Sequence, residues 1–255
     1  MYISYLNLIF KVFKLCYQIV CMVKIIKKTK EVYRWDKTFS REILNIAKKD
    51  WKKAVQIKEK TEYMRDYVLN EKVRGKLAEF MGVELNISGG SKVLDVGTGM
   101  GALTVALARR FDVFSADTNP YTLKFVKYRA EQENVDLKLY QIPQLPVKIP
   151  FKNGYFDVVI LNGVLEWVGK GAKGDVKDIQ MEVLKDVYGL VKDKGYFILA
   201  IENRIAFDWF KGKTSHENIM FADLMPRWLA NVICKKKKGY ERFKILYCLP
   251  NISKT

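Results

Sequence analysis

The sequence has few residues of the kinds that build metal sites or disulfide frameworks. Of its 255 residues, 4 are cysteine and 1 is histidine. The cysteines lie near the two ends of the chain, and they show neither a CxxC pattern nor the spacing of a zinc site: Cys16, Cys21, Cys234 and Cys248. We therefore expect free thiols, a reducing compartment such as the cytoplasm, and no bound metal.

Long uninterrupted apolar runs are also lacking. Residues 2–26 are apolar and aromatic, but three lysines interrupt them, and no uninterrupted piece approaches the roughly 20 residues of a spanning helix. The segment has no basic start and no small-residue cleavage site, which argues against a secretory signal. Two interpretations stay open. Either this segment is a helix lying in a membrane interface, or translation starts at Met22 and residues 1–21 are not native.

Basic residues outnumber acidic residues in the two flanks of the chain. Residues 1–90 carry 19 basic and 10 acidic side chains, residues 227–255 carry 8 and 1, and residues 91–226 carry 18 and 17. The net charge of +17 therefore comes almost wholly from the flanks. Basic flanks suit peripheral contact with an anionic membrane or RNA outside a reaction site, and the alternative is a lysine-rich solvated exterior.

The chain does contain a glycine-rich turn after a short apolar run. Residues 93–101 read Val-Leu-Asp-Val-Gly-Thr-Gly-Met-Gly, and a helical pattern follows from Ala102. Glycine adopts backbone angles that a Cβ forbids, and it lets the main chain approach a ligand closely. The helix start beyond the turn offers unpaired N–H groups. This stretch predicts a site for a nucleotide-like ligand.

Strand-like and helix-like segments alternate after residue 91. The pattern predicts strands at 92–96, 113–116, 137–142, 156–161 and 196–201, and helices at 102–111, 120–133 and 178–191. Asn119-Pro120 supplies an N-cap and a proline at the first helical position. The helix at 178–191 should turn five side chains inward: Ile179, Val183, Leu184, Val187 and Leu190. The alternation indicates an α/β fold with a doubly wound, mostly parallel sheet.

Composition and spacing divide the chain into four segments. They are a basic apolar extension (1–35), a helical cap (36–90), a cofactor-binding α/β core (91–201), and substrate-side helices with a C-terminal strand (202–255). Apolar side chains at helical spacing predict two or three helices in the cap, and residues 88–91 are interpreted as a boundary linker. Only residues 243–249 are strand-like after the core, so the C-terminal strand region is shortened.

Two acidic residues indicate which ligand binds at the glycine turn. The spacing Gly97-x-Gly99-x-x-Ala102 also satisfies the dinucleotide fingerprint. However, Asp95 just before the turn is a poor neighbour for a pyrophosphate and a good one for a cationic, amino-acid-bearing ligand. Asp117 ends the second strand, where it can accept hydrogen bonds from ribose hydroxyls. This set fits S-adenosylmethionine, and a nicotinamide oxidoreductase is the weaker alternative.

Four ordered blocks of the chain resemble the class I S-adenosylmethionine-dependent methyltransferases. The blocks are Val93–Gly101, Ser115–Asp117, Ile149–Val159 and Gly195–Ile201, so the resemblance runs from about Lys92 to Ile201. Among these enzymes the chain is most similar to the type 11 group, which includes quinone-biosynthesis methyltransferases. The resemblance implies a Rossmann-like class I methyltransferase fold and a transferase that uses S-adenosylmethionine.

The resemblance also implies residue roles toward the cofactor. The glycine turn would wrap its amino-acid part and sugar, Asp95 would hold the amino group, and Asp117 would bind the ribose hydroxyls. Gln141 stands where many relatives carry an acid that binds adenine. The predicted cofactor-binding residues are Asp95, Gly97, Thr98, Gly99, Gly101, Asp117, Thr118, Gln141, Asn162 and Gly163.

The acceptor is expected to be a hydroxyl or carbon of a small molecule, lipid or glycan. Family members that methylate nucleic-acid or protein amides carry an Asn/Asp-Pro-Pro-aromatic motif where this chain has Asn-Gly-Val-Leu at residues 162–165. A general base assists a hydroxyl acceptor, and ligands bind at the carboxyl ends of the strands. The candidate catalytic residues are His216, Glu166 and Glu202. The candidate substrate-binding residues are Trp167, Asn203, Arg204 and Arg227. Capping, packing and ion pairing are the structural alternatives for these side chains.

Two other functions stay open. The basic flanks are compatible with an RNA methyltransferase. The missing adenine-binding acid and the short C-terminal region are compatible with a non-catalytic cofactor-binding or scaffold member of the fold. For all of these functions we expect a cytoplasmic protein, and the basic flanks are compatible with peripheral contact with a membrane.

Overall fold

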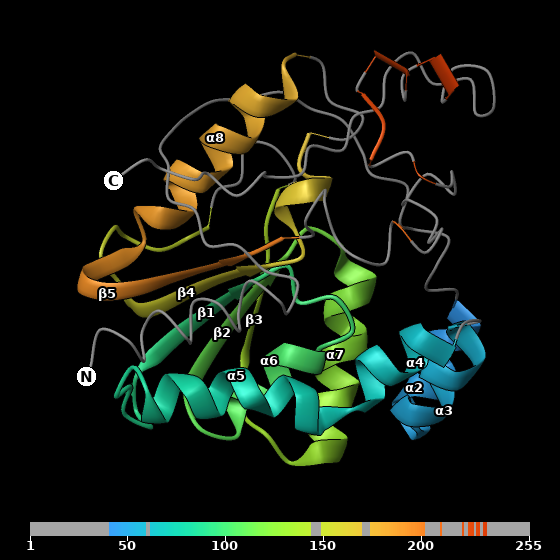
Figure 1. The fold of residues 1–255 in the computed structure, drawn as a ribbon. Helices are drawn as coiled ribbons and strands as arrows, with labels where there is room; N and C mark the ends of the chain where they lie inside the picture. Colours follow the sequence, from blue (N-terminus) through green and yellow to red (C-terminus); the bar gives the residue numbers. More distant parts are fainter. Residues whose placement is uncertain are drawn as a thin grey trace. The chain divides into compact units, whose positions relative to one another are not determined.

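The computed structural model describes residues 41–59, 62–143, 149–169 and 174–201, with isolated positions between 210 and 233. The helices of this part are α2 (Arg41–Lys49), α3 (Trp51–Lys58), α4 (Glu62–Leu69), α5 (Glu71–Val83), α6 (Ala102–Ala108), α7 (Pro120–Glu133), the short 3-10 helix η1 (Leu165–Trp167) and α8 (Val176–Tyr188). The strands are β1 (Lys92–Val96), β2 (Asp112–Asp117), β3 (Lys138–Gln141), β4 (Phe156–Asn162) and β5 (Val191–Ala200) (Figure 1).

The chain forms two compact units. The larger comprises Met22–Asn162 and Met181–Ile198, and the smaller comprises Met1–Cys21, Gly163–Gln180 and Leu199–Thr255. No described helix is both long and apolar enough to cross a membrane.

The strands form one five-stranded sheet in the order β3-β2-β1-β4-β5. β1 pairs in parallel with β2 and with β4, and β2 pairs in parallel with β3. This confirms the expected α/β class and the mostly parallel sheet. The chain moves outward from β1 to β3 and then returns to β4 on the other side of β1. Such a reversal leaves a crevice at the carboxyl ends of the strands, where open α/β sheets bind ligands.

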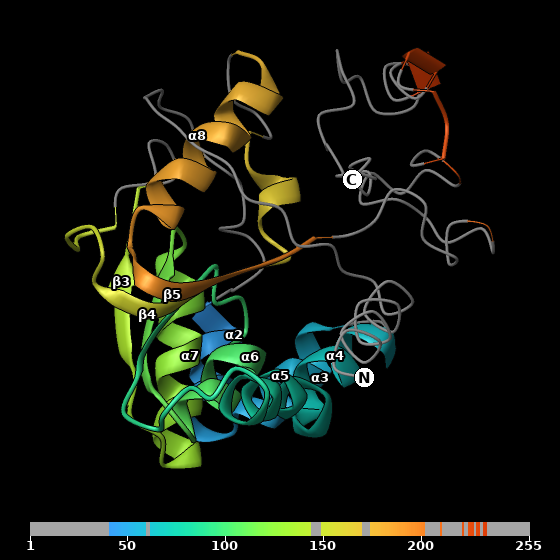
Figure 2. The ribbon, with the colours of Figure 1, turned by 60° about the vertical axis from the view of Figure 1, so that its left-hand side comes forward.

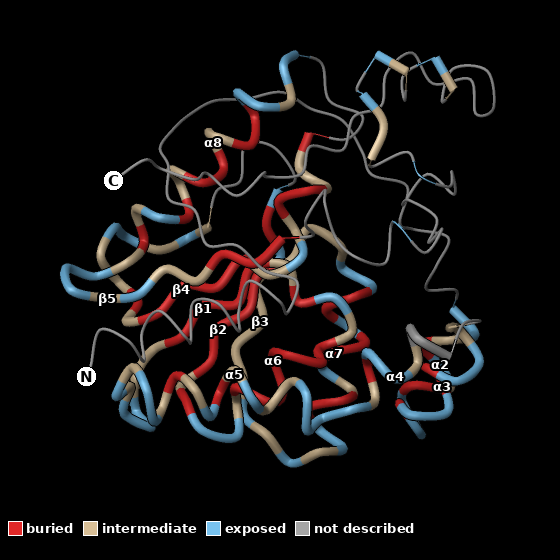
Figure 3. Tube along the Cα trace, in the orientation of Figure 1, coloured by how far each residue is buried: buried red, intermediate tan, exposed pale blue. Residues whose placement is uncertain are grey.

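The middle of the sheet is the main core. Figure 3 shows β1, β2 and β4 as largely buried, and Figures 1 and 2 place α5, α6 and α7 along one face of the sheet. The apolar cluster beneath α5 and α6 comprises Ala78, Met81, Val93, Leu103, Leu107, Phe111, Val113, Val158 and Ile160. Because α5 supplies Ala78 and Met81, residues 88–91 join α5 to β1 within one core.

A second cluster joins the helical cap to α7. Its buried members are Leu44, Ala47, Trp51, Ala54, Val55, Val68 and Phe125. Four described helices lie between residues 41 and 83, so the expectation of two or three was wrong. The physical reason is Asp50, whose carboxylate accepts a 2.9 Å hydrogen bond from Lys53 N and starts α3 immediately after α2 ends.

The ends of the helices agree with their predictions where capping residues fix them. The prediction of α7 is confirmed from Pro120 to Glu133, because Asn119 caps its start and Asn134 ends it in the left-handed region (φ 50°). The helix predicted to reach Phe111 instead ends at Ala108, and Phe111 turns into the core. The helix predicted at 178–191 runs from Val176 to Tyr188, and all five predicted inward side chains are buried.

The last strand differs most from its prediction. β5 begins at Val191 instead of Tyr196, and it ends at Ala200. Lys194 adopts φ 59° inside the strand, and a Cβ on Gly195 would lie only 2.8 Å from the Asp157 carbonyl oxygen. The segment Asp193-Lys194-Gly195 therefore lies within the strand, although it has the composition of a turn. Leu199 and Ala200 at the end of β5 and the adjoining Ile201 are fully buried, whereas the first part of the strand is exposed or half-buried.

Candidate cofactor site

The glycine turn has the backbone that its sequence predicts. Gly97, Gly99 and Gly101 have φ values of 86°, 51° and 73°, a region that residues with a Cβ seldom adopt. Gly97 N donates to Ala116 O at 2.7 Å, and Gly101 N donates to Thr98 O at 2.9 Å. The turn is thereby fixed to the end of β2 and to itself, and Gly101 is the N-cap of α6.

The glycines differ in what surrounds them, which gives a testable contrast. A Cβ on Gly101 would lie 3.0 Å and 3.2 Å from the two methyl groups of Val126, whereas a Cβ on Gly99 would meet no atom within 4 Å. We expect Gly99→Ala to lower the free energy of unfolding by about 1–2 kcal/mol through its positive φ. Gly101→Ala should lower it by about 2–4 kcal/mol, because crowding adds to the same strain.

Chemical denaturation measures both effects, and calorimetric titration with S-adenosylmethionine supplies the second readout. Gly99→Ala should weaken binding despite its smaller effect on stability, since its methyl group would enter the open space above the turn. Equal stability losses in the two variants would contradict the assigned packing.

A chain of hydroxyl groups lies behind the turn. Thr104 Oγ1 donates to Asp95 Oδ2 at 2.5 Å, and the Thr98 and Thr104 hydroxyl oxygens are 2.6 Å apart. Because Thr104 gives its proton to Asp95, Thr98 is the donor in the second bond. Asp95 is 2% exposed, and burial raises its pKa to about 7, with the nearby Asp117 charge adding to the rise and the Thr104 hydrogen bond opposing it.

Asp117 is placed at the mouth of the turn by the end of β2. Its Oδ2 accepts from Gly99 N at 3.3 Å and its Oδ1 accepts from Asn119 N at 2.9 Å. Burial raises the pKa of Asp117, although these backbone N–H groups oppose the rise. Gln141 pairs with Asp117 in the β2–β3 register and is exposed, and Thr118 is half-buried. The structure thus brings the predicted residues of β1, β2 and β3 to one edge of the sheet.

The sequence did not indicate the roles of two residues at this site. Thr104 is fully buried and is the one hydroxyl side chain in the apolar helix α6, a signal that could have linked it to Asp95. Asn119 was recognised as the N-cap of α7, and its Oδ1 does accept from Tyr121 N at 2.9 Å. Its Nδ2 is buried with no hydrogen-bond partner, next to Asp117, so a donor remains available at this site.

The candidate residues at the end of β4 and after it belong to different units. Asn162 is the half-buried last residue of β4, in the larger unit. In the smaller unit, Gly163 has φ 68° and its N–H donates to Ala200 O at 2.8 Å. Glu166 is 2% exposed, and its Oε1 lies 3.7 Å from the position of a Cβ on Gly163. Trp167 is half-buried in η1.

Five other candidates lie outside the described residues: Glu202, Asn203, Arg204, His216 and Arg227. Their assigned roles remain predictions. Within the described part of the chain, no group of three or more His, Cys, Asp or Glu side chains is arranged to hold a metal ion.

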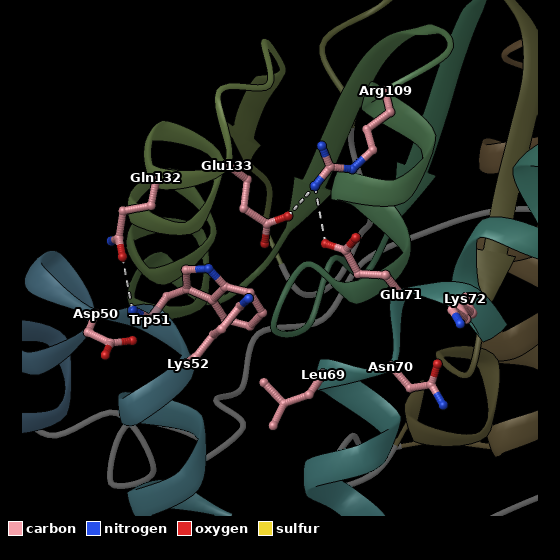
Figure 4. Close-up of a pocket in the computed structure, with 10 residues that line it drawn as sticks. All are labelled: Asp50, Trp51, Lys52, Leu69, Asn70, Glu71, Lys72, Arg109, Gln132 and Glu133. Atoms are coloured by element: carbon pink, nitrogen blue, oxygen red, sulfur yellow. Dashed lines mark hydrogen bonds and ion pairs between the residues drawn. The ribbon is translucent and has the colours of Figure 1, made fainter.

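A cavity of about 680 Å³ is lined by residues at the starts of α3 and α5 and at the end of α7, and by no residue of the glycine turn (Figure 4). Arg109 projects between Glu71 and Glu133, with Nη2 3.1 Å and 2.5 Å from their carboxylates. Burial raises the pKa of Glu133, and the hydrogen bond from Glu133 lowers that of Glu71. None of the predicted site residues lines this cavity, and Arg109 joins Glu71 of α5 to Glu133 of α7 across it.

Comparisons with known proteins find methyltransferases over the segment that contains the glycine turn. Residues 94–199 match the methyltransferase domain family. The chain is 31% identical over 118 residues to a ribosomal protein L11 methyltransferase of Streptococcus thermophilus, which covers 46% of the chain and 33% of that protein. It is 29% identical over 157 residues to a ubiquinone biosynthesis O-methyltransferase of Acinetobacter baumannii, covering 60% and 57%. The chain therefore spans a third to just over half of these relatives.

Solved structures are similar at lower identity. A putative S-adenosylmethionine-dependent methyltransferase from Methanococcus maripaludis is 16% identical with a TM-score of 0.44, covering 84% of this chain and 76% of that one. An S-adenosylmethionine-dependent methyltransferase from Clostridium acetobutylicum is 20% identical with a TM-score of 0.46, covering 56% of each. The segment from Leu94 to Leu199 therefore matches a methyltransferase domain, in agreement with the resemblance of its sequence blocks to the class I S-adenosylmethionine-dependent methyltransferases.

Proposed function

We propose that this protein is an enzyme that transfers the methyl group of S-adenosylmethionine to a hydroxyl or carbon acceptor. The observation that carries the proposal is a pair of carboxylates at a three-glycine turn. Asp95 lies behind the turn and Asp117 at its mouth, and burial raises the pKa of both. Two such acids stabilise a bound cation, and they disfavour a pyrophosphate.

The residues of the site fit this cofactor. Gly99 leaves open space above the turn, which would accommodate the amino-acid part of the cofactor. Asp117 keeps lone pairs for ribose hydroxyls after accepting two backbone N–H groups, and the Asn119 amide offers a further donor. Asp95 lies behind the turn, where the Thr104 hydroxyl donates to its carboxylate and the Thr98 hydroxyl donates to that of Thr104. When bound, S-adenosylmethionine supplies a methyl group already activated by a sulfonium.

The protein's own contribution to the transfer is alignment and exclusion of water. The turn would fix one end of the cofactor, and Asn162 ends β4 at the edge of the sheet where β1 and β2 also end. The Asn-Gly-Val-Leu sequence at 162–165 supports an acceptor other than a planar amine. The partial similarity to a ubiquinone biosynthesis O-methyltransferase supports a hydroxyl acceptor in a small molecule or lipid.

Two measurements test the proposal. Calorimetric titration should show that both S-adenosylmethionine and its demethylated product bind, and radiolabelled cofactor incubated with fractionated lysate should label a small-molecule, lipid or glycan fraction. Label in the RNA or protein fraction would show that the acceptor belongs to that class and would contradict the proposed small-molecule, lipid or glycan acceptor. Cofactor binding without label in any fraction would favour a scaffold role. A nicotinamide nucleotide that binds where both methyl-cofactor forms fail would overturn the family-based function.

Glu166 is the described candidate for a general base. Because it is almost completely buried beside Gly163, it would act on an acceptor proton in surroundings that exclude water. We expect Glu166→Gln to lower turnover of the labelled acceptor by about a hundredfold and to leave the cofactor dissociation constant unchanged. Glu84→Gln, at an exposed position, should change neither quantity. Unchanged turnover in Glu166→Gln would remove Glu166 from the reaction and leave it a structural role.

A further inference from the structure

Arg129, on α7, is the largest fully buried side chain in the described structure, with 0% exposure. Arginine is almost never fully buried unless it is paired. Here Nε donates to Glu133 Oε1 at 2.8 Å, one turn along the same helix. The rest of the guanidinium reaches other parts of the fold, so a local ion pair does not account for its position.

The other partners of the guanidinium come from the helical cap and from the glycine turn. Nη1 donates to Met100 O at 3.1 Å and to Val68 O at 3.4 Å. The centre of the guanidinium lies 3.8 Å from the centroid of the Trp51 ring, a cation–π contact. Arg129 therefore bonds to the turn on one side and to α3 and α4 on the other.

Met100 is the residue through which this contact reaches the cofactor site. It lies between Gly99 and Gly101, and its side chain packs against the cap cluster that includes Trp51 and Val68. The Met100 carbonyl and the Gly101 N–H belong to one planar peptide group. Arg129 holds the carbonyl end of that group, and Thr98 O accepts the N–H end at 2.9 Å.

The three glycines of this turn have no side chains that could restrict their backbone angles. Each glycine would otherwise sample many backbone conformations, and ordering the turn only on ligand binding would lower affinity. A buried guanidinium that fixes one peptide plane reduces this freedom before the ligand arrives. The Trp51 ring and Val68 carbonyl fix the guanidinium in turn, so the packing of the cap supports the geometry of the turn.

We propose that Arg129 is a positioning residue that preorganises the glycine turn for the cofactor, and that it makes cofactor affinity depend on the docked helical cap. The inference deepens the proposed function, on which it rests. It assigns to the cap a role in forming the cofactor site in addition to any contact with the acceptor.

The test compares Arg129 with a neighbour that ties α7 to the cap but not to the turn. Gln132 accepts from Trp51 N at 3.1 Å and donates to Ala47 O at 2.7 Å. Arg129→Met keeps an unbranched side chain over Trp51 but removes every donor, Arg129→Lys keeps the charge without the planar fork, and Gln132→Ala removes both cap bonds.

Affinity for S-adenosylhomocysteine is measured by calorimetry, well below the melting temperature of each full-length variant. We expect Arg129→Met to lower affinity at least about tenfold and Arg129→Lys to lower it less, because lysine can still donate to one carbonyl. Gln132→Ala should lower the melting temperature and leave affinity within about twofold of the parent. If Arg129→Met does not fold, the Arg129→Lys variant is the test. If this variant binds S-adenosylhomocysteine with the same affinity as the parent, the proposal is overturned.

Hydrogen exchange at the backbone separates this proposal from the proposed function. Without ligand, the amides of Gly101 and Val105 should exchange faster in Arg129→Met than in Gln132→Ala, since both amides donate within the turn and the first turn of α6. Faster exchange with no cofactor binding even by the parent would refute the function while supporting the positioning role. Equal exchange in the two variants, with equal affinities, would reduce Arg129 to a structural ion pair.

Discussion

Replacing Asp117 with asparagine should weaken the binding of S-adenosylmethionine by about a hundredfold, since hydrogen bonds to a charged acceptor contribute about 1.5–3 kcal/mol each. The carboxylate lies at the end of β2, and two backbone N–H groups already fix its orientation. Asparagine has nearly the same shape, but one of its two terminal groups is a donor that would face the N–H of Gly99 or Asn119. Calorimetric titration gives the dissociation constant directly.

Asp112 provides the matched control at the other end of the same strand. Its carboxylate pairs with Lys138 at the start of β3, far along β2 from the glycine turn. Asp112→Asn should therefore leave the dissociation constant unchanged. If both variants bound with the affinity of the parent, the ribose-binding role of Asp117 would be refuted.

The second large effect concerns the stability of the protein without cofactor. Burial raises the pKa of Asp95 to about 7, compared with 3.8 in an unfolded chain. The folded state thus binds the proton more tightly, and between about pH 4 and pH 7 the unfolded state binds fewer protons. The free energy of unfolding should fall as pH rises through this window and level off above it. The gap between the two pKa values corresponds to about 4 kcal/mol.

Denaturant unfolding at a series of pH values measures this dependence. Asp95→Asn should be more stable than the parent at pH 8 and should lose most of the slope, with a smaller slope left from the raised pKa of Asp117. Thr104→Val should extend the window to higher pH, because it removes the hydrogen bond that opposes the rise. A parent protein with no slope between pH 4 and pH 7 would show that Asp95 is ionised in the folded state.

The same charge should link cofactor binding to pH with the opposite sign. A cationic ligand beside Asp95 favours the ionised carboxylate, so the affinity for S-adenosylmethionine should increase as pH rises through about 7. Asp95→Asn should bind more weakly at pH 8 and should lose this dependence. The ionised Asp95 would then lower the stability of the protein without cofactor and strengthen the binding of the cationic cofactor. Ionisable groups with shifted pKa values are common in functional sites.

Features fixed by local interactions were predictable from the sequence. The start of α7 follows from Asn119 and Pro120, and the glycine turn follows from alternate glycines after an apolar strand. The start of β5 was not predictable in this way, because Asp193-Lys194-Gly195 has the composition of a turn but lies within the strand, where the lack of a Gly195 side chain permits close packing against Asp157.

Long-range contacts explain what the sequence could not indicate. A charged residue near the C-terminal end of α7 is normally exposed, yet Arg129 is buried by partners 29 and 61 residues away in the chain. Asp95 was recognised as a ligand candidate, but its raised pKa depends on burial and on Asp117, 22 positions further on. Patterns within ten or fifteen residues carry no information on such pairs.

The core that α5 shares with the sheet limits how far the chain can be shortened while it still folds. The family-matched segment begins at Leu94, but Ala78 and Met81 fill the space against Val93, Leu107 and Val158. A fragment trimmed to residues 94–199 would expose this apolar surface and lose the first residues of β1. Autonomous folding therefore requires a start no later than α5, and a fragment that also retains Trp51 and Val68 is needed to keep the Arg129 contacts.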